Sequence, residues 1–311
     1  MFNKVYLGAT PIKKIYLGDV PIKYGKNVIA IYTVSKEGEF FPRESNIEGK
    51  APDWKEELRD NGDGTYTVTI TGSYAPTKLQ FTYFIKLLSV QYLDISNMTS
   101  MENMFYNCST LTSIEGIADW DVSKVIYMAR IFEGCRSLTL LDLSNWNVSN
   151  IIDMSHMFSG CTNLTSLGNI TNWNTKNLAV TWGMFGSCYN LKSLDLSGWY
   201  TKQITRISAM FSNSGITTLD LSNWELVLAE GDYSNRNVSC DDMFYNCGEL
   251  ENIILDNCNY STINKIVTSP NMITSDSYYY DSNKEHNIYI PKGTQDRVTE
   301  APAGWNYVYI D

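Results

Sequence analysis

The sequence predicts a repeat solenoid, with a parallel β-sheet on one face and short helices on the other, preceded by a small β-rich module. A Met-Phe or Ile-Phe pair, followed three residues later by Cys or Ser, recurs through the middle of the chain, and a tryptophan keeps the same period. The marks are Phe105, Phe132, Phe158, Phe185, Phe211 and Phe244, and Trp120, Trp146, Trp173, Trp199 and Trp224. The phenylalanines are separated by 27, 26, 27, 26 and 33 residues. A period of this size means that each unit buries its apolar face against the next.

The unit at residues 138–161 contains both predicted elements. Leu141 and Leu143 alternate with polar residues, which predicts a short strand with one buried face. The apolar residues from position 151 to 158 fall at helical spacing, and Ser149 could serve as the N-cap of a short helix. Stacked units would place the strands in a parallel sheet, about 4.8 Å apart, with the helical turns on the opposite face.

The order of residues within the repeat also points to a family. Residues Leu138–Leu164 follow the pattern LxxLDLSxWxVSxVxxMxxMFxxCxxL, and Leu191–Ser214 are a near copy. This pattern resembles the BspA-like leucine-rich-repeat family, whose relatives include mycoplasma surface lipoproteins, and it covers about residues 84–258. The resemblance implies a right-handed solenoid of leucine-rich-repeat type, exposure at a cell or particle surface, and binding rather than chemistry.

The remainder of the chain divides around this repeat. We expect a duplicated β arm at residues 1–27, a small β-rich module at 28–83, the solenoid at 84–258 and a C-terminal capping segment at 259–311. In the module, residues 28–34 and 65–71 are rich in β-formers and predict two strands. Gly and Asp residues at 60–64 predict the turn that leads into the second strand.

The N-terminal arm is a tandem duplication, because Lys4–Lys13 is repeated as Lys14–Lys23. Short β runs broken by Gly and Pro predict a hairpin or two extended arms. A lone ten-residue hairpin is marginal in water, so we expect it to be ordered by docking on another surface. The assembly contacts we expect are Tyr6, Leu7, Tyr16 and Leu17. This opening resembles the N-terminal segments of tail and other virion proteins from gut-associated bacteriophages.

Composition and charge exclude some classes of binding partner. The net charge of −10 and the pI near 4.8 make a phosphate backbone a poor partner, so we expect no nucleic-acid binding. No apolar run is long enough to span a membrane, so we expect no membrane insertion. Residues 1–8 lack the apolar run of a signal peptide, so we expect no export signal there. Self-association remains an open partner class.

The residues that usually carry chemistry are sparse or buried. Four or five of the seven cysteines occupy one repeat position, which predicts free buried thiols, and no CxxC pair suggests a zinc site. Only His156 and His286 are histidines, and His156 falls at a variable position, which predicts a surface side chain. No nucleophile elbow, zinc-protease motif, phosphate loop or dinucleotide fingerprint is present. We therefore expect no enzyme activity, no cofactor and no bound metal.

One recurring acid invites a sharper hypothesis. Asp94, Asp142, Asp195 and Asp220 share one strand position, and the last two fall in adjacent units, where like charges would raise each other's pKa. Either each carboxylate accepts hydrogen bonds within its own turn, or this face binds a cation or a basic partner. Residues 225–238 are an insert in the repeat, and we expect them to form a surface loop. The binding surface we expect is Asp195, Asp220, Tyr233, Arg236, Tyr278, Tyr279 and Tyr280.

These features favour a non-enzymatic bacteriophage structural and adhesion protein, located in the tail or on the capsid of the virion. Its arm would attach to other virion proteins, and its solenoid would present a surface to a host protein or glycan. A bacterial surface-exposed leucine-rich-repeat adhesin is the alternative. A glycan-active enzyme would need paired carboxylates about 5 to 10 Å apart, and no Asp/Glu pair stands out from the repeat.

Overall fold

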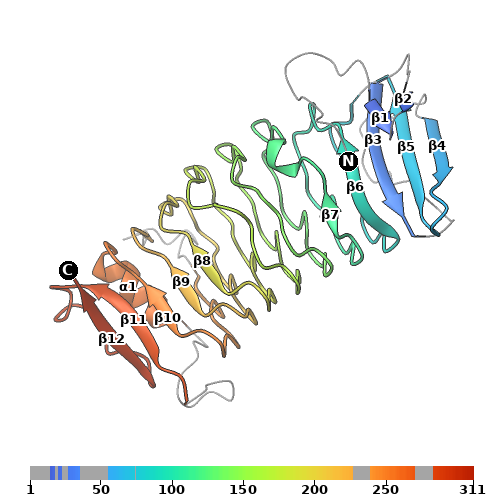
Figure 1. Ribbon diagram of the computed structural model, residues 1–311. Helices are drawn as coiled ribbons and strands as arrows, with labels where there is room; N and C mark the ends of the chain where they lie inside the picture. The colour runs from blue at the N-terminus through green and yellow to red at the C-terminus, as the bar shows by residue number, and fades with distance from the viewer. Residues whose placement is uncertain are drawn as a thin grey trace.

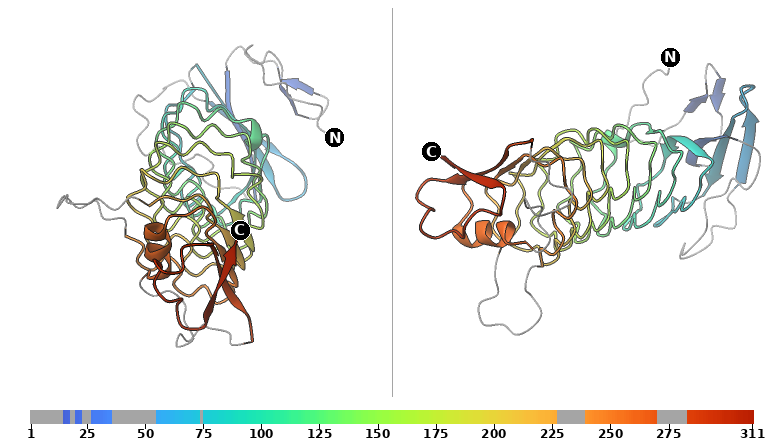
Figure 2. Two further views of the ribbon diagram at one scale, coloured as in Figure 1. Left: turned by 90° about the vertical axis from the view of Figure 1, so that its left-hand side faces the viewer. Right: turned by 90° about the horizontal axis from the view of Figure 1, so that it is seen from below.

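The chain forms an elongated stack of coils, with the N-terminal strands at one end and the C-terminal strands at the other (Figures 1 and 2). The structure is a computed structural model. It describes residues 15–17, 20–22, 27–35, 55–73, 75–226, 239–269 and 283–311. The described residues are mostly strands and turns, with one 3-10 helix and one α-helix among them. One apolar core runs through the stack from Ile29 to Trp305.

The N-terminal end is a five-stranded sheet in the order β4-β5-β3-β6-β7. Its strands are β3 (Asn27–Val34), β4 (Lys55–Asp60), β5 (Tyr66–Gly72), β6 (Leu87–Leu93) and β7 (Ser113–Ile114). The two strands predicted in this module are β3 and β5, which pair antiparallel. The predicted turn joins β4 to β5, and the Asp60 carboxylate accepts a hydrogen bond from the Gly62 N–H at 2.8 Å. Because β6 pairs parallel with β7, this sheet leads directly into the first coils.

The C-terminal end is a parallel sheet in the order β12-β11-β10-β9-β8. Its strands are β8 (Ser193–Asp195), β9 (Thr218–Asp220), β10 (Asn252–Ile254), β11 (His286–Pro291) and β12 (Trp305–Ile310). Helix α1 (Tyr260–Val267) begins where the Asn259 side chain accepts a hydrogen bond from the Thr262 N–H. The 3-10 helix η1 (Ile117–Asp119) lies in an earlier coil.

A continuous row of phenylalanine rings and a set of tryptophan rings fill the interior of the coils. Seven phenylalanines from Phe81 to Phe244 stack in sequence, with ring centroids 5.4–5.9 Å apart. The repeat tryptophans are also buried, and each indole N–H from Trp146 onward donates to a backbone carbonyl of the preceding coil; Trp146 bonds to the Ile117 oxygen at 2.8 Å. The periodic marks therefore form the interface between coils, as predicted.

The predicted short helices are wrong for the coils. The Met-Phe segments are consecutive turns, because left-handed residues recur every four positions, as at Arg130 (φ 60) and Gly134 (φ 74). Left-handed residues cannot continue an α-helix. Alternate N–H groups instead donate to carbonyls of the next coil; those of Met101, Asn103, Phe105 and Asn107 donate to Tyr127, Ala129, Ile131 and Glu133. The same four-bond ladder joins the following coils, so these turns connect coils as a sheet would.

The cysteines are free and buried, as predicted. The thiol of Cys135 donates to the carbonyl of Phe105 at 3.1 Å, and Cys161 and Cys188 repeat this bond one and two coils later. Each thiol thus satisfies a carbonyl of the preceding coil from inside the core. Burial raises the pKa of all seven thiols, which keeps them protonated and unreactive.

These thiols should make the protein less stable in alkali. Burial raises the pKa of both Cys108 and Cys188 to about 12, whereas an exposed cysteine titrates near about 8.5. Above about pH 8.5 the unfolded chain loses these protons first, so each pH increase up to about 12 favours unfolding. We expect the wild-type Tm to fall through this window, and to fall less steeply in a Cys108→Ala/Cys188→Ala variant. Thermal unfolding followed by circular dichroism measures both slopes, and equal slopes would contradict this assignment.

Candidate binding surfaces

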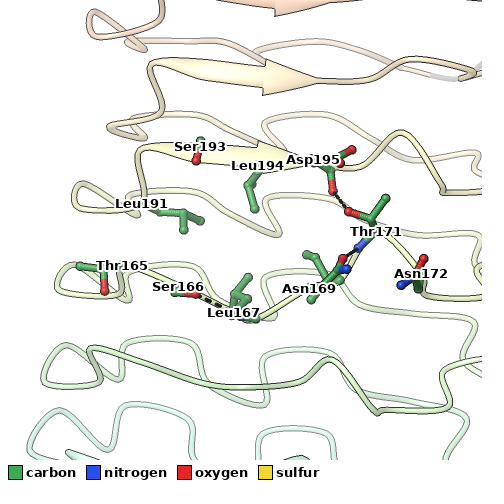
Figure 3. A pocket seen from close by; sticks show the side chains of 12 residues that line it. Thr165, Ser166, Leu167, Asn169, Thr171, Asn172, Leu191, Ser193, Leu194 and Asp195 are labelled. Carbon is green, nitrogen blue, oxygen red and sulfur yellow. Dashed lines mark hydrogen bonds between the residues drawn. The ribbon is translucent and has the colours of Figure 1, made fainter.

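A shallow groove of about 440 Å³ opens between two successive coils beside β8 (Figure 3). Its lining is mostly hydroxyl, amide and backbone groups from residues 165–172, together with Leu191 and Ser193–Asp195. Thr171 closes one end, where its hydroxyl donates to the Asp195 carbonyl at 3.0 Å. A groove with this lining offers hydrogen bonds to a polar ligand, and Leu167, Leu191 and Leu194 add apolar surface.

The groove lies beside a coil that carries an extra residue, as the coil at 114–117 also does. Where several coils read Leu-Asp-Leu, this coil reads Leu167-Gly168-Asn169-Ile170, and Gly168 adopts φ 71. A side chain at Gly168 would overlap the Asp142 carboxylate and the Ser144 hydroxyl of the preceding coil. The C-terminal sheet ends at β8, which pairs with β9 alone. The bulge therefore separates two coils that would otherwise continue the ladder.

The recurring aspartates accept hydrogen bonds from residues of their own turns. The Asp195 carboxylate accepts hydrogen bonds from the Ser197 N–H at 2.9 Å and from its hydroxyl at 2.6 Å. Asp142 accepts the same two bonds from Ser144. Asp94 and Asp220 accept a bond from the backbone N–H two residues later. The first of the two alternatives for these residues is therefore the observed arrangement.

The expected rise in pKa at the adjacent pair is wrong for Asp195. Asp195 and Asp220 do lie opposite each other in the parallel register of β8 and β9. Partial burial acts to raise the pKa of Asp195, but hydrogen bonds from Ser197 and Thr171 outweigh it, and the pKa is lowered. Donors that stabilise the carboxylate thus decide the result. Asp195 lines the groove as an anion, whereas Asp220 does not line it.

Most of the other predicted contacts lie outside the described residues. They are Tyr233, Arg236, Tyr278, Tyr279, Tyr280, Tyr6 and Leu7. Tyr16 and Leu17 belong to β1 (Ile15–Leu17), which pairs antiparallel with β2 (Val20–Ile22). The second copy of the duplicated arm therefore contains a hairpin, one of the two forms predicted for it.

Sequence reasoning missed a row of planar side chains on the outside of the stack. We name it the planar row; it consists of Tyr83, Tyr106, Arg130, His156 and Trp182, one from each of five successive coils. The two tyrosine rings meet edge to face at 5.0 Å, and the guanidinium carbon of Arg130 lies 6.0 Å from the centre of the Tyr106 ring. The His156 and Trp182 ring centres are 4.6 Å apart.

His156 is therefore not the plain surface side chain that its position predicted. It is half-buried, and its Nε2 atom is enclosed without a hydrogen-bond partner. Its ring lies against Gly183, where a Cβ atom would come within 2.6 Å of the imidazole. Burial lowers the pKa of His156, Arg130 lowers it further and Asp153 opposes the shift, so the ring is neutral at neutral pH. The planar row thus contains one cation, Arg130.

Spacing in the sequence held a signal for this row. Arg130 and His156 each stand two residues before the phenylalanine of their coil, and Trp182 stands three residues before its own. Because the three residue types differ, a search for recurring letters does not detect them. Across the described residues, the chain contains no helix that is both long enough and apolar enough to span a membrane.

Comparison with known proteins adds a family. The model of a family described as a mycoplasma protein of unknown function, DUF285, matches residues 79–169 and 141–256. The two matches overlap within the coil stack and together span more than half of the chain. No curated protein matches the sequence. The chain therefore belongs to the DUF285 family.

Proposed function

We propose that this chain is a non-enzymatic adhesion protein, built as a BspA-like solenoid of leucine-rich-repeat type. The 26-residue coils, their buried leucines and the parallel pairing of β8 to β12 support this assignment. In such a scaffold the stacked coils supply rigidity, and the outward positions are left to recognise a partner. The partner is a protein or a glycan on a host surface.

One observation carries this proposal: the planar row crosses five coils, with contacts between the two tyrosines, between Tyr106 and Arg130, and between His156 and Trp182. Trp, Tyr and Arg are the residue types that most often dominate binding energy at interfaces, since they offer large contact area at low entropic cost. Their backbone is held by the ladder that joins successive coils, for example by the bond from the His156 N–H to the Trp182 carbonyl at 2.8 Å. A preorganised surface loses less entropy on binding than a flexible one.

We further propose that the protein belongs to a bacteriophage virion, where residues 1–27 attach it to other virion proteins. The duplicated sequence and the β1–β2 hairpin support an arm that docks. A two-stranded hairpin is marginal alone, so docking would supply its missing contacts. The cellular location is then the virion, after synthesis in the host cytoplasm.

Deleting residues 1–27 should remove the protein from purified particles while the coils stay folded. Density-gradient purification followed by immunoblotting measures incorporation, and circular dichroism of the isolated protein measures folding. A chain of the same length with residues 1–27 scrambled is the matched control, and it should also be lost from particles. Normal incorporation of the deleted chain would rule out the arm as the attachment segment.

A bacterial surface adhesin is the second candidate, and the mycoplasma family match favours it. The two candidates place the protein in different fractions of an infected or producing culture. Antibody labelling of intact uninfected cells supports the adhesin, whereas labelling confined to particles supports the virion protein. Both candidates use the coil stack as the adhesive surface.

A further inference from the structure

We propose that the planar row binds a neutral, linear glycan that lies along the axis of the stack, with sugar rings on the faces of Trp182, Tyr106 and Tyr83. This inference rests on the proposed adhesive function and names the ligand class of that surface.

Exposure separates Trp182 from the other tryptophans. The Trp182 side chain is 46% exposed, whereas every other tryptophan that the structure describes is at most 7% exposed. Tyr83, at the other end of the row, is 54% exposed. An exposed indole that contacts only one neighbouring ring has apolar surface left for a ligand. The row therefore begins and ends in accessible aromatic rings.

The side chains at the equivalent positions of the neighbouring coils are small, which leaves the Trp182 ring accessible. The same coil position holds Ser155 in the preceding coil and Ser208 in the following coil, so the indole stands above small neighbours. Gly183, the next residue, contributes no side chain, and the His156 ring occupies the place where its Cβ would be. The Ser208 hydroxyl lies 2.8 Å from the Ser239 hydroxyl and 3.1 Å from the Ser239 carbonyl oxygen, and it keeps one acceptor lone pair for a ligand. A ring with hydroxyl and amide groups beside it suits a sugar, which has apolar faces and polar edges.

The spacing of the row suits a polymer. Each coil contributes one planar group, and parallel strands recur about every 4.8 Å. This rise is comparable with the length of one pyranose unit, so a linear glycan along the axis would meet the coils nearly in register. A protein interface usually needs about 20–30 residues a side, and a single file of five side chains is far narrower.

The charges favour a neutral ligand over an anionic one. Arg130 is the one cation of the row, and its Nε lies 3.7 Å from the Glu133 carboxylate. His156 adds no charge, and Asp153 lies close enough to influence it. The protein as a whole carries −10. A sulfated or sialylated chain would therefore meet no compensating positive field.

The test uses the full-length protein on an array of neutral linear glycans, with sulfated and sialylated glycans as a second set. We expect wild type to bind members of the neutral set, and Trp182→Ala to weaken that binding by roughly tenfold or more. Trp182→Phe keeps a ring and should retain part of the affinity. Tyr189→Ala is the matched control, because Tyr189 is 51% exposed in the same coil but outside the row, and it should bind as wild type does.

Glycan titration of tryptophan fluorescence locates the contact, since the wild-type signal minus that of Trp182→Phe reports on the exposed indole. The inference is overturned if no neutral glycan binds, if only acidic glycans bind, or if Trp182→Ala binds like wild type while folded by circular dichroism. Host-cell adhesion is scored separately. If the wild-type protein adheres to host cells but binds no glycan on the array, the glycan assignment is wrong and the ligand is a protein. If the wild-type protein does not adhere to host cells at all, the proposed function is wrong.

Discussion

Replacing Phe158 by alanine should lower the free energy of unfolding by about 3–5 kcal/mol. Phe158 is fully buried and lies between Phe132 and Phe185, with ring centres 5.9 and 5.6 Å away. The substitution therefore removes contacts on both faces of one ring and leaves a cavity at the interface of two coils. Stacked aromatic pairs also contribute about 0.5–1.5 kcal/mol beyond the area they bury.

Urea unfolding measures this loss. Ile152→Ala is the control from the same coil, because Ile152 is 40% exposed, and we expect a change within about 0.5 kcal/mol. In a stack of coils each unit contacts only its neighbours, so the variant should also open locally around this coil before the ends unfold. A loss below about 1 kcal/mol would mean that the ring row does not carry the stability of the stack.

Replacing Gly215 by alanine should cost about 1–3 kcal/mol or more, although it adds a single methyl group. The new Cβ would overlap the carbonyl oxygen of Tyr189 and lie 2.7 Å from its carbonyl carbon, both in the backbone of the preceding coil. A backbone group cannot rotate away as a side chain does. The Gly215 N–H also donates to the Cys188 carbonyl at 3.2 Å, so moving the coil would strain this bond.

Gly186→Ala is the matched control for this substitution. Both glycines have ordinary backbone angles, but a Cβ at Gly186 would lie no closer than 3.3 Å to another atom, the Gly183 oxygen. We expect its Tm to stay close to that of wild type, whereas Gly215→Ala should lower the Tm by several degrees. Equal Tm values for the two variants would show that the coils can separate at Tyr189 without cost.

The interior of the stack was predictable because the same residue types recur at fixed positions of the repeat. Phe, Trp and Cys each occupy one coil position, and a shared position means shared burial. The turns were not predictable in the same way. Arg130 adopts a left-handed angle that non-glycine residues seldom adopt. The apolar residues near Arg130 and His156 fall at helical spacing, and this spacing outweighed the signal from Asn103 and Gly183 at the equivalent places in other coils.

The site was less predictable than the fold for a related reason. Asp195 was predicted because an aspartate recurs at its position, yet its carboxylate already accepts a hydrogen bond from the Ser197 hydroxyl. The planar row uses four residue types in five coils, so the three-dimensional stack is what brings its members together. The change from Asp to Gly168-Asn169 was visible in the sequence, but its effect, a groove at the end of the sheet, depends on which strand would have paired there.

The four-bond ladder between coils has a mechanical consequence. Its bonds lie along the length of the rod, so a pull between the two ends loads successive interfaces in series and the weakest one yields first. Each released coil of 26 residues would lengthen the chain by about 90 Å. A rod of this kind would therefore extend under load in discrete steps, while the remaining coils stay intact.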